Sequence, residues 1–260
     1  MTTEQQQPSP VLPTMRLDGQ VALVSGAGRG LGRASALALA TAGAEIVALA
    51  RTAAEIEELC DEIIAGGGVA TPLVCDVTDT AAVKKTVGGL ARLDILFNNA
   101  GANIPEPLEE VTEAHLDQIL ALNVKAVFVV SQQAVARIRA GGRGGSIVHM
   151  SSQMGHVGAP NRTVYCMTKH AVEGLTKAMA VELAPEKIRV NAIGPTFIET
   201  PMTKPFFDNP AFTQDTLTRI PMGRVGQINE VTGAVVFLSS PAASLITGAS
   251  LVIDGGWTAW

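Results

Sequence analysis

Short apolar runs alternate with helical patterns along almost the whole chain. The first run, Val21–Ser25, is followed by an alanine- and leucine-rich stretch at residues 31–42 that Gly43 closes. The next run is Glu45–Ala50, after which Thr52-Ala-Ala-Glu55 has the sequence of a helix capping box. The start of the chain is therefore predicted to fold as strand, helix, strand, helix.

The later apolar runs continue this alternation, at residues 70–75, 93–98, 146–150, 188–193 and 250–253. Near-continuous apolar strands separated by helices indicate a parallel sheet covered on both faces. Pro72 interrupts the first of these runs, and proline is tolerated essentially on edge strands. We predict an α/β fold: a doubly wound Rossmann-type sheet of seven parallel strands in the order 3-2-1-4-5-6-7, with Pro72 at the edge.

Composition narrows the class of protein. The 260 residues are 47% hydrophobic and 17% charged, which suits a large hydrophobic core. We predict a single domain over residues 16–260, preceded by a Gln- and Pro-rich disordered tail at residues 1–15. The net charge of −5 gives no electrostatic footprint for nucleic acid, and no apolar stretch approaches the length of a membrane-spanning helix. A cytoplasmic location is the default expectation.

The three cysteines do not change this expectation. Cys60, Cys75 and Cys166 have no metal-ligand spacing, and their odd number suits reduced thiols. We predict no metal site. Cys166 follows a candidate catalytic tyrosine, but a small core residue is the simpler interpretation.

A glycine cluster between the first strand and its helix suggests a dinucleotide site. Gly26, Gly30 and Gly32 would let the backbone approach a pyrophosphate, and the helix N-terminus would supply N–H donors together with Leu31. The cluster lacks a strict G-x-G-x-x-G spacing, so a plain flexible turn competes with this interpretation. Its position directly after the first strand favours the cofactor.

The residues near the cofactor ribose favour NADP(H) over NAD(H). A site for NAD usually has an acidic residue at the end of the second strand. Here the strand ends at Ala50 and is followed by Arg51, while Arg29 lies within the glycine cluster. Two guanidinium groups would favour a 2′-phosphate. The competing interpretation is that both arginines are solvated surface residues.

Tyr165 is the only tyrosine of the chain, and Lys169 follows it by four residues. The spacing places both on one helix face, where the ammonium could lower the pKa of the phenol and prepare it for acid–base chemistry. The same spacing also arises by chance on amphipathic helices. Ser152 follows a strand end, where open α/β sheets bind ligands, or it caps a helix. Asn123 lies on the apolar stripe of a long helix predicted at residues 112–140, in a structural or a chemical role.

Taken together, these residues resemble the short-chain dehydrogenase/reductase family over about residues 17–256. The motifs that carry the resemblance are Gly26-x-x-x-Gly30-x-Gly32, Asp76-Val77, Asn98-Asn99-Ala100-Gly101, Asn123, Ser152, Tyr165-x-x-x-Lys169, the segment from Pro195 to Thr200, and Asp254-Gly255-Gly256. Thr196 departs from the glycine that usually follows this proline, and we expect its hydroxyl to face solvent. Ser25 replaces a usual threonine.

The resemblance implies an oxidoreductase that interconverts a ketone and a secondary alcohol by hydride transfer. Tyr165 would be the general acid/base, Ser152 would donate to the substrate oxygen, and Lys169 would hold the nicotinamide ribose. Asn123 would position a water of the proton relay. The residues implied to contact the cofactor, besides the glycines, are Asp76 and Val77, Asn98, Ala100 and Gly101, and Pro195, Ile198 and Thr200.

The substrate is less clearly indicated. Residues 194–228 contain five prolines and little periodicity, as lids and binding loops do. The apolar residues there either form a wall of the substrate site or pack the loop down; they are Met202, Phe206, Phe207 and Phe212. Gln153, His156 and Asn103 are candidate polar contacts, although His156 more simply reads as an ordinary loop residue.

The family resemblance includes gluconate 5-dehydrogenases and 3-oxoacyl-carrier reductases, so sugar acids, polyols, cyclic ketones and acyl thioesters all stay open as substrates. An NAD(H)-dependent enzyme and a non-catalytic cofactor-binding scaffold are the alternatives. The resemblance also implies a homo-oligomer, a dimer or a tetramer, with Trp257 and Trp260 as candidate interface residues.

Overall fold

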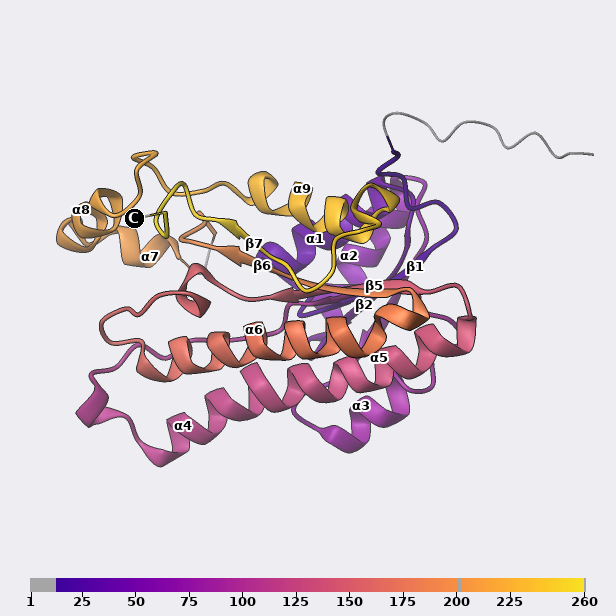
Figure 1. Cartoon of the computed structure of the whole chain (residues 1–260), viewed down its shortest axis with the longest axis horizontal. Helices are drawn as coiled ribbons and strands as arrows, with labels where there is room; N and C mark the ends of the chain where they lie inside the picture. Colours follow the sequence, from indigo (N-terminus) through magenta and orange to yellow (C-terminus); the bar gives the residue numbers. More distant parts are fainter. Residues whose placement is uncertain (1–12, 201–202, 260) are drawn as a thin grey trace, which may run out of the picture.

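The strands form one parallel sheet at the centre of the molecule (Figure 1). The computed structural model describes residues 13–200 and 203–259, apart from the side chains of residues 205, 206 and 211. The seven strands lie in the order β3-β2-β1-β4-β5-β6-β7, all parallel to their neighbours, as predicted. Their bounds are β1 Val21–Ser25, β2 Glu45–Ala50, β3 Ala70–Val74, β4 Ile95–Asn98, β5 Gly145–Met150, β6 Ile188–Pro195 and β7 Ser250–Ile253.

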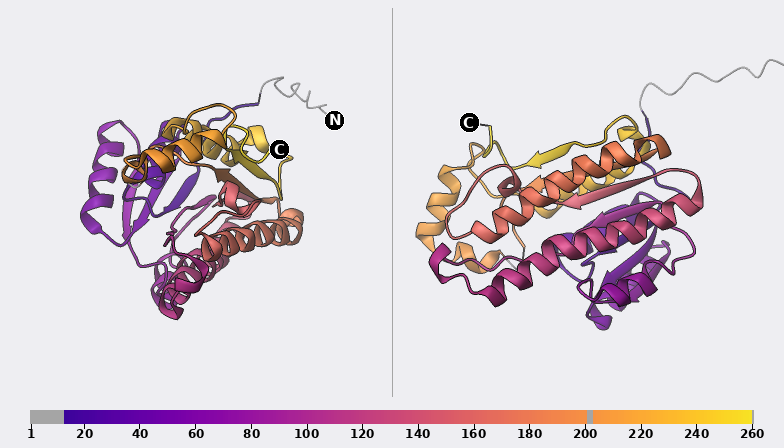
Figure 2. Two further views of the ribbon diagram at one scale, coloured as in Figure 1. Left: turned by 90° about the vertical axis from the view of Figure 1, so that its left-hand side faces the viewer. Right: turned by 60° about the horizontal axis from the view of Figure 1, so that its bottom comes forward.

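Helices cover both faces of the sheet (Figures 1 and 2). On one face lie α1 Gly30–Thr41, α2 Ala53–Ala65 and α9 Ile228–Ser239. On the other lie α3 Thr80–Thr86, α5 Val127–Gly141 and α6 Thr163–Leu183. Two further α-helices, α7 Lys204–Phe207 and α8 Pro210–Thr218, follow β6, and four short 3₁₀ turns are η1 Leu108–Glu110, η3 Gln153–Gly155, η4 Ala184–Glu186 and η5 Pro241–Ala243.

The hydrophobic core is divided by the sheet into two layers. Phe97 and Ile193 belong to the layer beneath α1, α2 and α9. Leu96 and Val190 belong to the layer beneath α3, α5 and α6. Neighbouring strand residues thus point to opposite faces, and both faces are buried, which explains why the strands read as continuous apolar runs.

Pro72 lies on β3, which is the edge strand of the sheet. The edge position that the proline required is therefore confirmed. The predicted capping box at Thr52 is wrong: Thr52 occupies the N-cap position of α2, but its side chain makes no capping hydrogen bond.

The predicted long helix at residues 112–140 is present but irregular. It begins as α4 Glu113–Leu120, widens into the π-helical turn η2 Ala121–Ala126, and continues as α5 to Gly141. This helix meets the length and hydropathy criteria for a membrane span, but half of its most apolar window is buried inside the protein. Because core helices of soluble proteins meet the same criteria, packing against the sheet and α6 explains its apolar face.

The segment after β6 is more ordered than its sequence suggested. We expected a structureless loop over residues 194–228, but α7 and α8 form within it. The rings of Phe197, Phe207 and Phe212 contact one another: the Phe197 centroid is 6.1 Å from Phe207 and 5.4 Å from Phe212, which are 6.0 Å apart. Trp257 packs on Phe197 as well, at 6.0 Å. These aromatic rings hold the segment against the C-terminal end of the same chain.

Candidate functional site

The glycine cluster forms the turn between the carboxyl end of β1 and the first residue of α1. Gly30 has a left-handed backbone (φ +56°), and a Cβ there would meet nothing within 4 Å. Arg29 is the N-cap of α1 and makes no side-chain cap, and no acidic residue lies in the first turn. The first N–H groups of this 12-residue helix are thus available to an anion. The observed backbone fits the pyrophosphate of a dinucleotide.

Close packing explains two of the glycines. A Cβ on Gly32 would overlap the carbonyl oxygen of Gly26, and a Cβ on Gly26 would meet Asn99 Nδ2 at 3.0 Å. Glu55 lies over the cluster as well, because a Cβ on Gly28 would overlap its carboxylate. The helical spacing of α2 gave no sign that Glu55 would reach this turn.

Ser25 links the glycine turn to the end of β4, a role that its sequence position alone did not reveal. Its buried hydroxyl accepts from the amides of Asn99 (2.9 Å) and Ala100 (3.1 Å) and donates to Asn98 Oδ1 (3.1 Å). Asn98 Nδ2 in turn donates to the carbonyl of Val127 at 2.9 Å. Asn98 therefore braces β1 and β4 against α5 with its side chain. Ala100 and Gly101, which were predicted with it to line the cofactor, are more exposed.

Arg51 and Asp76 lie at the ends of β2 and β3, where the adenosine half of a dinucleotide is expected. Arg51 Nη1 is 3.8 Å from Asp76 Oδ2, and 74% of the arginine side chain is exposed. Burial acts to raise the pKa of Asp76, but hydrogen bonds from Thr78 and the charge of Arg51 outweigh it, so this pKa is lowered. Arg29 is also exposed. Both guanidinium groups are thus accessible, Arg51 beside Asp76 and Arg29 at the glycine turn, and Val77 is buried.

Asn123 lies in the π-helical turn and ties three segments together. Its Nδ2 donates to the Ala102 carbonyl (2.8 Å) and contacts Thr168 Oγ1 on α6 (3.2 Å), while its Oδ1 accepts from the Ala102 amide (2.9 Å). The helix irregularity that a buried amide suggested is therefore observed. A Cβ on Gly101 would lie 3.3 Å from Asn123 Oδ1 and 3.8 Å from Lys169 Nζ, so the glycine brings these side chains close.

Tyr165 and Lys169 share one face of α6, as their spacing predicted. Lys169 Nζ lies 5.4 Å from the centre of the Tyr165 ring and donates to the Met150 carbonyl at the end of β5, at 2.8 Å. Lys169 is only 5% exposed. Burial lowers its pKa to about 8, and the charge of Glu173 acts in the opposite direction.

The prediction that the pKa of Tyr165 is lowered is wrong. Burial raises the pKa of Tyr165 to about 12, although Ser152 and the charge of Arg162 act to lower it. We expected Lys169 to lower this pKa. The amine instead points to the Met150 carbonyl, and desolvation of the phenol dominates.

Ser152 lies just after β5 and caps a helix, which is one of the two roles that its position suggested. It is the N-cap of η3, accepting from the Met154 amide at 3.1 Å. Its hydroxyl donates to Gln153 Oε1 (2.7 Å) and lies 3.5 Å from the Pro195 carbonyl. Gln153 is itself buried, at 2% exposed. The Ser152 hydroxyl would have to give up this hydrogen bond in order to donate to a substrate oxygen.

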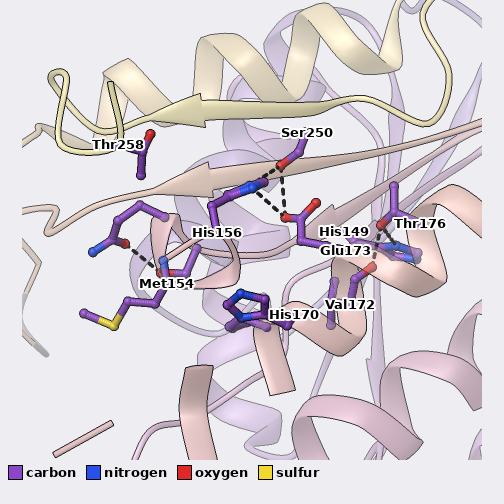
Figure 3. A network of polar contacts seen from close by, with 12 residues as sticks. His149, Met154, His156, His170, Val172, Glu173, Thr176, Ser250 and Thr258 are labelled. Atoms are coloured by element: carbon purple, nitrogen blue, oxygen red, sulfur yellow. Dashed lines mark hydrogen bonds and ion pairs between the residues drawn. The ribbon is translucent and has the colours of Figure 1, made fainter. Parts of the chain in front are cut away.

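A buried histidine of β5 contacts the helices α5 and α6, and Figure 3 shows it beside Thr176 of α6. His149 is fully buried, with Nδ1 2.9 Å from Thr176 Oγ1 and Nε2 3.1 Å from Ser131 Oγ. Ser131 Oγ also accepts a hydrogen bond from Asn98 Nδ2 at 3.2 Å. Burial and the charge of Lys169 lower the pKa of His149 to about 4, so the ring is neutral at neutral pH.

The end of β6 approaches the same region. Pro195 is its last residue, Ile198 is buried, and Thr200 Oγ1 pairs with Thr203 Oγ1 at 3.0 Å. Thr196 was expected to turn its hydroxyl to solvent, and that expectation is wrong. Its Oγ1 is buried without a hydrogen-bond partner among the described residues, and its amide bonds to the Ile253 carbonyl.

The predicted substrate residues are only partly described. Met202 and the Phe206 side chain lie outside the described residues, and Asn103 is exposed. Arg162, the residue before α6, was missed. Its Nη1 donates to the Asn161 carbonyl (3.0 Å), and its charge acts on the pKa of both Tyr165 and Cys166. A guanidinium one turn before Tyr165 could have been noticed from its i, i+3 spacing.

The cysteines are all free and buried. Burial raises the pKa of Cys166, which supports the core interpretation over a reactive thiol. Within residues 13–200 and 203–259, no group of three or more His, Cys, Asp or Glu side chains is arranged to hold a metal ion.

Comparison with known proteins identifies the family. Residues 26–258 match the family model described as Enoyl-(Acyl carrier protein) reductase. The chain is 42% identical to L-xylulose reductase of Bos taurus, covering 94% of this chain and 99% of the relative. It is 40% identical to 3-oxoacyl-[acyl-carrier-protein] reductase FabG of Thermotoga maritima, covering 93% and 99%.

A solved structure agrees with these relatives. The gluconate 5-dehydrogenase of Burkholderia cenocepacia, in complex with NADP and tartrate, superposes with a TM-score of 0.91 at 34% identity, covering 95% of this chain and 98% of that one. The chain belongs to the short-chain dehydrogenase/reductase family of oxidoreductases. The seven-stranded Rossmann sheet is the fold that the family resemblance implied.

Proposed function

We propose that the protein is an NADP(H)-dependent oxidoreductase that interconverts a ketone and a secondary alcohol on a small, hydroxyl-rich substrate. The observation that carries the proposal is the meeting of Tyr165, Lys169 and Ser152 at the carboxyl end of β5. Asn123 anchors the loop beside them through Ala102. Open α/β sheets bind their ligands at this edge.

The glycine turn would hold the pyrophosphate, and Lys169 the nicotinamide ribose. Arg29 and Arg51 favour a 2′-phosphate, and the bound NADP of the Burkholderia gluconate 5-dehydrogenase supports the same preference. Ala100, Gly101, Pro195, Ile198 and Thr200 would line the remainder of the cofactor site. When bound, the nicotinamide supplies or accepts the hydride.

The chain's own residues would manage the proton. Ser152 would turn from Gln153 to donate to the substrate oxygen, and Tyr165 would protonate that oxygen as it becomes an alkoxide. A phenol with a raised pKa is protonated at neutral pH, so it can act as the acid in the reducing direction. A positive charge on Lys169, 5.4 Å from the centre of the ring, would act in favour of the remaining phenolate, although burial dominates the pKa of Tyr165.

A spectrophotometric assay tests the proposed function. NADPH and NADH are offered at equal concentration with a neutral ketopentose, a keto-aldonate and an acetoacetyl thioester. We expect oxidation of NADPH with one of the two sugar-type ketones, in line with the relatives named L-xylulose reductase and gluconate 5-dehydrogenase. Turnover with the thioester alone would favour the 3-oxoacyl alternative, and a preference for NADH would contradict the cofactor assignment.

Arg162 gives a specific reason to keep the sugar acids in this panel. Its half-buried guanidinium acts on the Tyr165 phenol, and its described hydrogen bond goes to a backbone carbonyl. Such a group suits a substrate carboxylate. Arg162→Gln should therefore lower kcat/KM for the keto-aldonate at least about tenfold while changing that for the ketopentose little. Equal losses for both substrates would remove Arg162 as the basis of selectivity.

We also propose a homo-oligomer, a single domain over residues 16–260 and a cytoplasmic location. The support for the oligomer is an apolar surface on two adjacent helices: Phe128 of α5 is 51% exposed, and Met167 and Val181 of α6 are 48% and 81% exposed. Figure 2 shows these helices side by side on one surface of the molecule. Of the two tryptophans predicted at an interface, Trp257 packs against Phe197 of its own chain, and Trp260 lies outside the described residues.

A further inference from the structure

A carboxylate is buried one helical turn beyond Lys169. Glu173 is 5% exposed and follows Lys169 by four residues on α6, so both project from the same face of the helix. Its Oε1 accepts from Ser250 Oγ of β7 at 2.9 Å and lies 3.4 Å from His156 Nε2. His156 Nε2 is 3.0 Å from the same Ser250 hydroxyl (Figure 3).

Three separate parts of the chain thus meet at this carboxylate. α6 supplies Glu173, β7 supplies Ser250, and the loop that carries Ser152 supplies His156. Gly155 makes the approach possible, because a Cβ there would lie 3.1 Å from Glu173 Cγ and 3.2 Å from the Lys169 carbonyl oxygen. His156 is therefore not the ordinary loop residue that its position suggested.

Burying a carboxylate is costly unless it is hydrogen-bonded and paired. The hydroxyl of Ser250 and the ring of His156 reduce that cost, so the charge can remain beneath the protein surface. In this poorly solvated region the field of the carboxylate at Lys169 is screened much less than it would be in water.

The other groups facing Lys169 do not supply a counter-charge. Tyr165 on the same helix is a neutral phenol at neutral pH, and His149 on β5 is a neutral imidazole. Burial of the lysine favours its uncharged amine, whereas Glu173 favours the ammonium. The Met150 carbonyl orients the amine without supplying a full charge.

We propose that Glu173, held by Ser250 and His156, is a positioning residue that keeps the catalytic-face Lys169 in its ammonium form. The proposal rests on the proposed function in so far as a charged Lys169 is needed there for the tyrosine and the cofactor ribose. It adds a residue that touches neither substrate nor cofactor and acts through the lysine. Through Ser250 and His156, β7 and the loop after Ser152 would also influence the protonation of Lys169.

A direct titration tests the proposal without any cofactor or substrate. The protein is labelled with ¹³C at the lysine Cε, and the Lys169 resonance is assigned by its absence in Lys169→Met. We expect the midpoint of this resonance to fall by about one pH unit in Glu173→Gln, which keeps the shape and removes the charge. Glu182→Gln, at an exposed carboxylate on the same helix, should leave the midpoint unchanged. An unchanged midpoint in Glu173→Gln would overturn the proposal.

Activity supplies the second readout. If protonated Lys169 is the working form, the alkaline decline of kcat/KM should move to lower pH in Glu173→Gln, and Glu173→Asp should restore part of the shift. A variant that merely loosened the fold would lose turnover at every pH. Should Glu173→Gln not fold, Glu173→Met, which also removes the charge, carries the same titration, with a lowered midpoint expected and an unchanged one contrary to the proposal. Absence of ketone turnover in the wild type would contradict the proposed function while the titration still decides the role of Glu173.

Discussion

At the scale of single residues, the site combines side chains that we propose act on the substrate with others that hold the surrounding elements together. We assign Tyr165 and Ser152 to the first group. Ser25 and Asn98 belong to the second, because every described polar contact of theirs joins β1, β4 or α5. Substitutions in the first group should therefore lower turnover, whereas substitutions in the second group should lower the stability of the fold.

Tyr165→Phe tests the first group. The variant keeps the ring that packs beside Lys169 and deletes the proton donor, so kcat should fall at least about a hundredfold. Affinity for NADPH, followed by fluorescence titration, should stay within about twofold of the wild type. Near-normal turnover would rule out the tyrosine as general acid/base.

Gly32→Ala tests the fit of the cofactor turn. The added Cβ would overlap the Gly26 carbonyl oxygen, so the turn must distort and the affinity for NADPH should drop about tenfold or more. Gly233→Ala on α9 is the matched control, since its Cβ meets nothing within 4 Å. The control should bind NADPH normally and unfold at the same or a slightly higher temperature. Equal behaviour of the two variants would contradict the steric argument.

At the scale of elements, sequence patterns predicted the sheet well and the local exceptions poorly. The strand order was predicted from the alternation of apolar runs, which depends on burial, and from Pro72, which lacks the backbone N–H that an interior strand donates. The direction in which the pKa of Tyr165 is shifted could not be predicted from the Tyr-x-x-x-Lys spacing. This direction depends on how far the fold removes solvent from the phenol. The missing cap at Thr52 and the two helices after β6 likewise depend on tertiary packing, as does the contact of His156 with Glu173.

His149 couples β5 to α5 and α6, and its burial makes stability depend on pH. Its pKa is about 4 in the folded protein against 6.5 without burial, so the unfolded chain takes up the proton first as the pH falls. This part of the stability is therefore present above about pH 6.5 and is lost as the pH falls to 4, by up to about 3 kcal/mol.

Urea unfolding at pH 7 and at pH 4.5 measures this effect. His149→Asn should show a smaller difference in unfolding free energy between the two pH values than the wild type, even if it is less stable at both. His170→Asn, at an exposed position on α6, should retain most of the wild-type difference. The same pH dependence in His149→Asn and in the wild type would show that other groups are responsible.

At the scale of the whole molecule, the exposed apolar surface of α5 and α6 should be covered by a second copy of the chain. Val181→Glu introduces a charge at its most exposed apolar position and should shift the sedimentation profile toward smaller species. Ile64→Glu, at a 53% exposed site on α2, should leave the profile unchanged. A wild-type monomer would contradict the proposed oligomer outright.

The strand order also places the two parts of the proposed site in different parts of the sequence. The chain completes β1, β2 and β3 on one side of its starting strand, then returns to add β4 to β7 on the other. The glycine turn and Arg51 come from the first half, whereas Asn123, Ser152, Tyr165 and Lys169 all follow β4. In the proposed assignment, the residues for nucleotide preference and those for the reaction therefore come from separate stretches of sequence that meet at the boundary between β1 and β4. The two stretches are nevertheless bound to one another, because Ser25 contacts Asn98 across this boundary and α1 of the first stretch packs against α9 of the second.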